Sequence, residues 1–140
     1  MRLVDTNVIL RYLMGDVPGQ ARVAHGIIQR IARGEEDALI LHSVVHEVCY
    51  ALTSSTPGAG YNLTHLDARN RLLPILSLEH IHVLPDKQLC LIALDIFAQG
   101  EKIDFTDALQ VAYVRGGLSD GIYSFDKRID RIAGARRVQL

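Results

Sequence analysis

The 140-residue chain is predicted to fold as one α/β domain over residues 1–140, a three-layer α/β/α sandwich around a mainly parallel sheet of about five strands. Apolar segments of about four residues alternate along it with longer segments whose apolar residues recur at helical spacing. Hydrophobic residues make up 49% of the chain, which is enough for one core. Strands that alternate with helices are joined in parallel by right-handed crossovers.

The first half of the chain predicts two strands and four helices. Leu3 and Val4 begin a short buried strand that ends at Asp5. Ser43 is suited to cap the helix after the second strand, and Gly34 is suited to end the long helix before that strand. The predicted strands span 3–5 and 38–41, and the predicted helices span 7–14, 18–33, 43–53 and 64–76.

The second half repeats this alternation. Gly100 follows one predicted helix, and the Gly116-Gly117 pair ends the next. The predicted strands span 81–84, 121–125 and 137–140, and the predicted helices span 86–98, 104–114 and 127–133.

Several classes of protein are excluded. The apolar runs are too short to span a membrane, and an acid at position 5 argues against a secretory signal, so a cytoplasmic protein is expected. Cys49 and Cys90 lie in apolar helical patterns and are expected to be reduced core residues. Two scattered cysteines cannot form a zinc site, and the motifs of nucleotide-binding loops and serine hydrolases are absent from the sequence.

Acidic residues recur where predicted strands end or predicted helices begin. Because the carboxyl ends of parallel strands meet at one edge of a sheet, we expect these side chains to lie together. Such a cluster is unstable unless it holds protons or divalent cations, and oxygen ligands suit Mg²⁺ or Mn²⁺. The acids are Asp5, Glu47, Asp104, Asp107 and Asp126.

Two of these acids also have a purely structural interpretation within the first half of the chain. Asp5 suits the N-cap of the following helix. Glu47 lies beside its helix's apolar stripe, where a solvated acid near a helix start is common. His46 and Tyr50 are predicted to share the outer surface of that helix.

The later acids have structural alternatives too. Asp104 and Asp107 have the spacing of a capping box. Asp107 shares a face with Val111 and Val114, however, and an acid at the head of a buried face needs a partner. Asp126 suits a helix cap or an ion pair with the bases that follow it.

The net charge of −1 does not exclude a nucleic-acid partner. The five acids carry five of the negative charges, so the rest of the chain carries +4. Two bound divalent cations would bring the whole to +3, which permits a phosphate-backbone substrate.

Four segments in this order resemble those of a PIN-domain ribonuclease, specifically the VapC-type toxin of a bacterial or archaeal toxin–antitoxin pair. In LVDTNVILRYL, Asp5 matches the first metal-binding acid and Asn7 the accompanying amide. Glu47 in SVVHEVCYAL matches the second acid. The remaining matches are Asp107 with the frequent extra acid Asp104 in DFTDALQVAY, and Asp126 preceded by Ser124 in IYSFDKRIDRI.

The resemblance covers essentially the whole chain, although residues 56–63 match poorly. It implies a PIN-like fold, Mg²⁺ or Mn²⁺, and cleavage of RNA. It also implies a homodimer and a cognate antitoxin that inserts a segment into or near the acidic groove.

A hypothesis for the chemistry assigns a role to each residue type. The cation or cations would be held by Asp5, Asp107 and Asp126, with Asp104 nearby, and Glu47 would bind a second ion or orient the attacking water. Thr6, Asn7 and Ser124 would support these ligands. The RNA backbone would meet Arg11, Lys127, Arg128 and Arg131, although plain surface charge is the more common explanation for any single one of them.

Two other functions remain open from the residues alone. A metal-dependent phosphatase or phospho-acceptor domain also places an Asp at a strand end, although a phosphatase usually has a second Asp where this chain has Asn7. A non-catalytic module with an acidic groove for a partner would respond to neither EDTA nor Mn²⁺.

Overall fold

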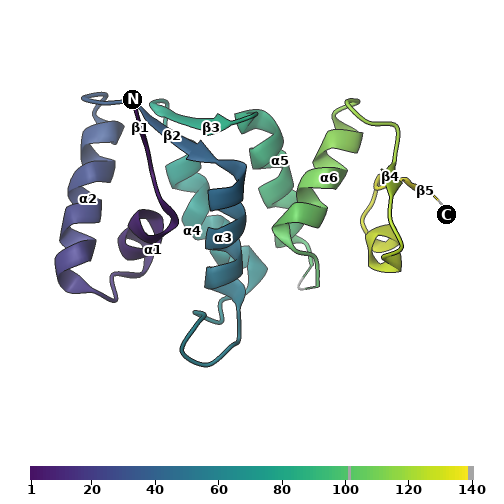
Figure 1. The fold of residues 1–140 in the computed structure, drawn as a ribbon, viewed down its shortest axis with the longest axis horizontal. Coiled ribbons are helices and arrows are strands. Elements are labelled where there is room, and N and C mark those ends of the chain that lie inside the picture. Colours follow the sequence, from purple (N-terminus) through teal and green to yellow (C-terminus); the bar gives the residue numbers. More distant parts are fainter. Residues whose placement is uncertain (101, 139–140) are drawn as a thin grey trace.

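A computed structural model describes residues 1–100 and 102–138, and its helices and strands follow the predicted alternation (Figure 1). The strands are β1 (Arg2–Leu3), β2 (Ala38–Leu41), β3 (Ile81–Leu84), β4 (Ile122–Tyr123) and β5 (Arg137–Val138). The helices are α1 (Thr6–Met14), α2 (Pro18–Ala32), α3 (His42–Thr53), α4 (His65–Leu76), α5 (Lys87–Ala98), α6 (Phe105–Arg115) and the 3₁₀ helix η1 (Lys127–Arg131).

The strands form two separate parallel sheets. One has the order β1-β2-β3, and the other contains β4 and β5. The prediction of an α/β fold with parallel strands is therefore confirmed, but the strands do not join into a single sheet of about five. The fifth predicted strand spans 137–140, and its last two residues, 139 and 140, lie outside the described part of the chain.

The two sheets lie far apart along the molecule. Figure 1 shows β1 beside α1 and α2 toward one end, and the β4–β5 pair beyond α6 at the other end. Helix α6 packs mainly against α5 and also contacts α3. The acids of the first half and those of the second half therefore approach one another across α3 and α6, not along one continuous sheet edge.

One face of the three-stranded sheet is much more buried than the other. Ala38, Ile40, Ile81 and Val83 point into the core and are at most 3% exposed. The register puts Leu3 beside Leu39 and His82, and Leu41 beside Leu84, all on the opposite face. The exposed apolar residues on that face are Leu3 (65%), Leu41 (38%) and Leu84 (43%). All-parallel sheets are normally covered on both faces, whereas one face of this sheet leaves apolar side chains exposed.

The helix starts show which local signals were reliable. Asp86 and Asp104 cap α5 and α6 by accepting backbone hydrogen bonds from Leu89 and Asp107. The prediction that Ser43 caps α3 is wrong, because the helix already begins at His42. β2 runs directly into α3, and no side chain is needed to redirect the backbone.

Cys49 and Cys90 are buried free thiols, as predicted. Burial raises the pKa of Cys90 to about 12 and raises that of Cys49 still further. Neither thiol is therefore ionised at neutral pH.

Within the described residues, no helix has both the length and the apolar character needed to cross a membrane.

Candidate functional site

The first group of predicted site residues gathers where β1 ends and α1 begins. Asp5 occupies the N-cap position of α1, yet its side chain makes no capping hydrogen bond. Thr6 donates a hydrogen bond from its hydroxyl group to Glu47 on α3. Asp5, Asn7 and Glu47 are all exposed. The structural interpretation of Asp5 as a helix cap is thus not realised, and its carboxylate is available to a ligand.

The second group lies at the start of α6. Asp104 is exposed, and one of its carboxylate oxygens accepts the backbone N–H of Asp107 at 2.8 Å. Asp107 is half-buried at the head of a helix face whose Val111 and Val114 are buried, as predicted. The capping interpretation therefore accounts for the carboxylate of Asp104, but it gives no role to the carboxylate of Asp107.

Asp126 lies just beyond β4 and is held by local contacts. Its backbone N–H donates to the hydroxyl of Ser124 at 3.0 Å, and its carboxylate caps η1 by accepting the backbone N–H of Arg128 at 2.9 Å. The guanidinium of Arg128 also donates to both carboxylate oxygens, at 2.6 to 3.0 Å. The side-chain hydrogen bond from Arg128 lowers the pKa of Asp126 to about 2. In this arrangement Asp126 fulfils both structural alternatives predicted for it, the cap and the ion pair.

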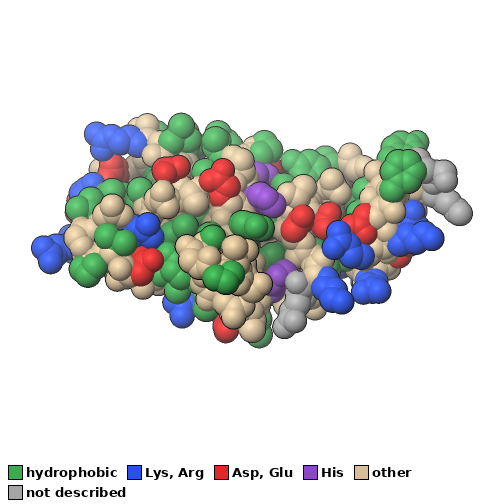
Figure 2. Space-filling model, turned by 60° about the horizontal axis from the view of Figure 1, so that its bottom comes forward, with side chains coloured by type: hydrophobic (Ala, Val, Ile, Leu, Met, Phe, Trp, Pro, Cys, Tyr) green, Lys and Arg blue, Asp and Glu red, His purple; other side chains and the backbone are tan. Residues whose placement is uncertain are grey.

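Charges on the later acids influence one another. Burial raises the pKa of Asp107, and the nearby carboxylates of Asp104 and then Asp126 raise it further. Arg128 opposes this rise. Figure 2 shows acidic and basic side chains close together on this face, toward the C-terminal end of the molecule. These three acids form a second acidic group, defined as Asp104, Asp107 and Asp126.

The two acidic groups are neighbours without being one site. Between them, the hydroxyl of Thr106 on α6 lies 3.2 Å from Nδ1 of His46 on α3. Glu47 follows His46 on the same helix but faces Thr6 on α1. The predicted gathering of all the acids at one sheet edge is thus realised as two groups, because β4 does not lie in the sheet that contains β1.

We tested whether these residues fit a divalent cation. Their donor set suits Mg²⁺ or Mn²⁺, because every predicted ligand is a carboxylate. Across residues 1–100 and 102–138, however, no three His, Cys, Asp or Glu side chains are placed to hold one metal ion together. Within a single copy of the chain, the arrangement therefore does not complete the predicted metal centre.

The predicted RNA-binding bases have different surroundings. Arg11 is tied to other side chains: its Nη1 lies 3.2 Å from Asp16 and 3.2 Å from the hydroxyl of Tyr61. Arg128 is paired with Asp126. Lys127 and Arg131 are exposed. Of these bases, Lys127 and Arg131 at the two ends of η1 are the best placed to meet a polyanion, since Arg128 is already paired with Asp126.

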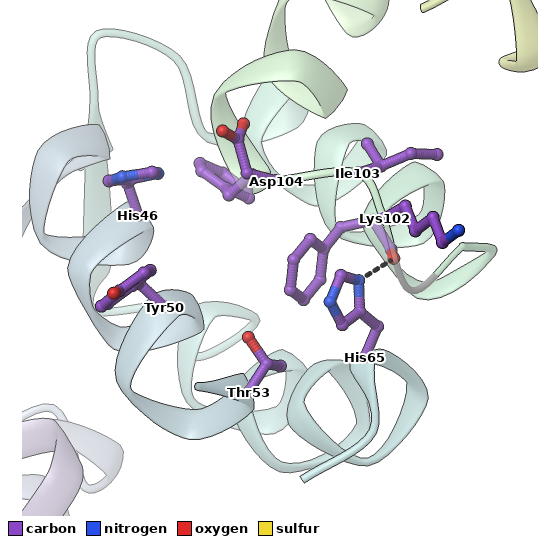
Figure 3. A pocket seen from close by; sticks show the side chains of 9 residues that line it. His46, Tyr50, Thr53, His65, Lys102, Ile103 and Asp104 are labelled. Carbon is purple, nitrogen blue, oxygen red and sulfur yellow. Dashed lines mark hydrogen bonds between the residues drawn. The ribbon is translucent and has the colours of Figure 1, made fainter. Parts of the chain in front are cut away.

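A pocket of about 180 Å³ beside the second acidic group was not predicted (Figure 3). His46 and Tyr50 line it from α3, Asp104 from the start of α6, and His65 and Lys102 from the facing side. Tyr50 is 65% exposed, as predicted for that surface, while His46 is half-buried and reaches Thr106.

The floor of this pocket is aromatic. The rings of His65 and Phe97 stack with centroids 4.0 Å apart, and Nδ1 of His65 lies 3.1 Å from the carbonyl oxygen of Phe97. The four-residue spacing of His46 and Tyr50 was a usable signal for one wall of the pocket. His65 and Phe97 are 32 positions apart, so no local sequence pattern predicts that their rings stack.

Comparison with known proteins identifies the family to which the chain belongs. A search of curated proteins finds no match to this chain. The family model described as PIN domain matches residues 2–135, a range that contains all five predicted acids. That range covers nearly the whole chain and agrees with the α/β fold and its parallel strands, so the chain belongs to the PIN domain family.

Proposed function

We propose that this protein is an endoribonuclease that depends on Mg²⁺ or Mn²⁺ and acts as the toxin of a toxin–antitoxin pair. PIN domains are generally metal-dependent nucleases. The observation that carries the proposal is the family match over residues 2–135, because the matched range includes every acid of the predicted site.

The state of Asp5 supports a catalytic function over a purely structural one. Asp5 is exposed at the carboxyl end of a parallel strand, where ligands bind in α/β folds, and it makes no capping hydrogen bond. Glu47 is held beside it through Thr6. An exposed acid such as Asp5, which makes no capping hydrogen bond, is better explained by a ligand than by stability.

The roles proposed for the side chains follow from their surroundings. Asp5 and Glu47 supply one set of oxygens, and the second acidic group supplies another. Lys127 and Arg131 would hold the RNA backbone, since both are exposed bases beside the second group. Because one copy does not bring three ligands together, we assign no catalytic step to the metal from this arrangement alone.

The proposed partners are an RNA substrate, a cognate antitoxin and a second copy of the chain. The antitoxin would place a segment into or near the acidic surface. Expression of the protein in a bacterium should arrest growth, and coexpression of a small DNA-binding protein encoded beside its gene should relieve the arrest. Mapping of new RNA ends in the arrested cells would identify the target.

The deciding experiment compares RNA cleavage by the wild type and by Asp5→Ala, in Mg²⁺, in Mn²⁺ and in EDTA. We expect cleavage only by the wild type with a cation. Asp67→Ala is the matched control, because Asp67 is an exposed acid in the first turn of α4, outside both acidic groups. Cleavage by Asp5→Ala at the wild-type rate would refute the proposal. Hydrolysis of a phosphorylated small molecule in place of RNA would favour a phosphatase.

A further inference from the structure

We propose that the β4–β5 pair of one copy joins the outer edge of β1 in a second copy, so that each complete acidic site is built from two chains. The metal-site part of this proposal rests on the proposed function. The strand exchange itself depends only on the fold.

The first observation is the uncovered edge of β1. Its hydrogen bonds go to β2: the backbone N–H groups of Arg2 and Val4 donate to the carbonyls of Asp37 and Leu39. No described strand pairs with its other edge. Leu3 there is 65% exposed, beside a hollow of about 130 Å³ lined in part by Val8 and Ile27. An open edge with apolar side chains is a template for another strand.

The second observation is the uncovered side of the β4–β5 pair. Among the described strands, β4 pairs with β5 alone. Tyr123 and Phe125 are 79% and 87% exposed, and Val138, which pairs with Tyr123, is 39% exposed. Figure 2 shows hydrophobic side chains at this end of the molecule. A two-stranded sheet is marginal by itself, and parallel sheets are normally buried, so this pair needs a surface to cover it.

The third observation is the distance between these two edges within one chain. Figure 1 shows β1 and the β4–β5 pair toward opposite ends of the longest axis, with α3 and α6 between them. Helix α6 is already packed on α5 and α3. The edge of β1 therefore lies open to β4 of another molecule.

A second copy is the occupant that satisfies both edges at once. It carries an identical β1 and an identical β4–β5 pair, so two copies can exchange these elements reciprocally and close a twofold dimer. The short segment 116–121 joins α6 to β4, and Gly117 in it has a φ of 76° that favours glycine. This segment is the natural hinge for the exchange.

The exchange also explains the divided site. Asp5 lies two residues beyond the carboxyl end of β1, and Asp126 lies three residues beyond the carboxyl end of β4. If β4 of the second copy pairs in parallel with β1, these two carboxyl ends lie next to each other, and Asp126 of that copy would lie near Asp5. Glu47 is already held there through Thr6. The third carboxylate that one copy lacks is thus supplied by the second copy.

Mixing two inactive variants tests this assignment. Asp5→Ala damages the β1 half of a site, and Asp126→Ala damages the β4 half. In a mixed dimer one site combines the two intact halves. Random mixing makes about half of the dimers mixed, each with one intact site, so we expect about one quarter of the wild-type cleavage rate.

A matched mixture provides the control. Asp5→Ala mixed with Glu47→Gln damages the β1 half in both chains, so this mixture should stay inactive. The two chains carry different affinity tags, so that mixed dimers can be isolated and counted. If Asp5→Ala and Asp126→Ala form no mixed dimers, or form them without restored cleavage, the shared site is refuted.

A crosslinking experiment tests the exchange without any enzymatic activity. Leu3→Cys in one tagged chain and Tyr123→Cys in the other should form a disulfide between chains after mild oxidation, since the native Cys49 and Cys90 are buried. Leu118→Cys is the control partner, because Leu118 is 67% exposed in the hinge outside β4. A chain with both Leu3→Cys and Tyr123→Cys that crosslinks within itself would show that β4 pairs with its own β1, and would overturn the proposal. If the Leu3→Cys and Tyr123→Cys chains crosslink as expected while the wild type cleaves no RNA, the proposed function is refuted and the exchange stands.

Discussion

The hydroxyl group of Thr6 donates a hydrogen bond to a carboxylate oxygen of Glu47, which links the first residue of α1 to the second turn of α3. The two residues are separated by 41 positions in the sequence. The contact fixes an exposed acid beside Asp5, so a residue with no catalytic chemistry of its own determines where an acid of the proposed site points.

Replacement of Thr6 by Val should therefore reduce cleavage without abolishing it. The side chain keeps its shape but loses the hydroxyl, so Glu47 is no longer oriented. We expect a loss of about 10-fold in the cleavage rate, typical of groups that orient ligands. Thr6→Ser should restore most of the rate, and equal rates for Thr6→Val and the wild type would show that the contact has no role in cleavage.

Asp5→Ala should remove activity while leaving stability nearly unchanged. Asp5 makes no capping hydrogen bond and is exposed, so its removal breaks no contact of the fold. We expect at least about a 100-fold loss of cleavage and a change in melting temperature within about 2 °C. A large drop in melting temperature, measured by calorimetry, would mean that Asp5 is a structural residue.

Asp104 allows its two roles to be separated by two substitutions. Asp104→Ala removes the cap of α6 and should lower the free energy of unfolding by about 1 kcal/mol. Asp104→Asn keeps an oxygen that can accept the N–H of Asp107, so stability should be retained. If the charge of Asp104 helps to hold the cation, both substitutions should raise the Mn²⁺ concentration needed for half-maximal cleavage by the same factor. Denaturant titrations and cleavage at several Mn²⁺ concentrations measure the two effects.

The contact between Tyr61 and Asp16 should make stability depend on pH. The hydroxyl of Tyr61 donates to Asp16 at 2.7 Å, and this hydrogen bond is the main cause of the lowered pKa of Asp16. Because the folded pKa is lowered, the stabilisation is present above the ordinary pKa of an Asp side chain and is lost as pH falls through the folded pKa.

Tyr61→Phe should therefore destabilise the protein at pH 7 and have no effect once Asp16 is protonated in both proteins. Asp16 is largely exposed, so solvent screening limits the effect to less than about 1 kcal/mol. Unfolding by urea at pH 7 and at an acid pH below the lowered folded pKa of Asp16 measures this difference. An equal loss at both values would assign the contribution of Tyr61 to packing alone.

Local patterns in the sequence were sufficient for most of the elements and for the immediate surroundings of the acids. The capping spacing of Asp104 and Asp107 is realised, and Val111 and Val114 are buried as their periodicity indicated. These features depend on neighbours within one helical turn. Ser43 was misjudged because a capping residue type is a preference, which the direct passage from β2 into α3 overrides.

The division of the strands into two sheets could not be foreseen. Alternation of strands and helices predicts parallel pairing, but it does not specify which strand lies beside which, since that choice depends on long-range contacts. β4 pairs with β5 instead of β1, so Asp126, which follows β4, lies away from the sheet that contains β1. The sequence therefore identified the acidic residues of the site. Whether these residues come together depends on which strand pairs with β4, a strand of only two residues, Ile122–Tyr123.

The burial of Cys49 and Cys90 gives the protein a built-in reporter of its own opening. A thiol that is neither ionised nor accessible does not react with an alkylating reagent, so labelling requires the surrounding helices to separate. Cys49 lies on α3 beside the acidic residues and Cys90 on α5. Both thiols belong to the same core, so the rates at which iodoacetamide modifies them would report how often that core opens, without any added probe.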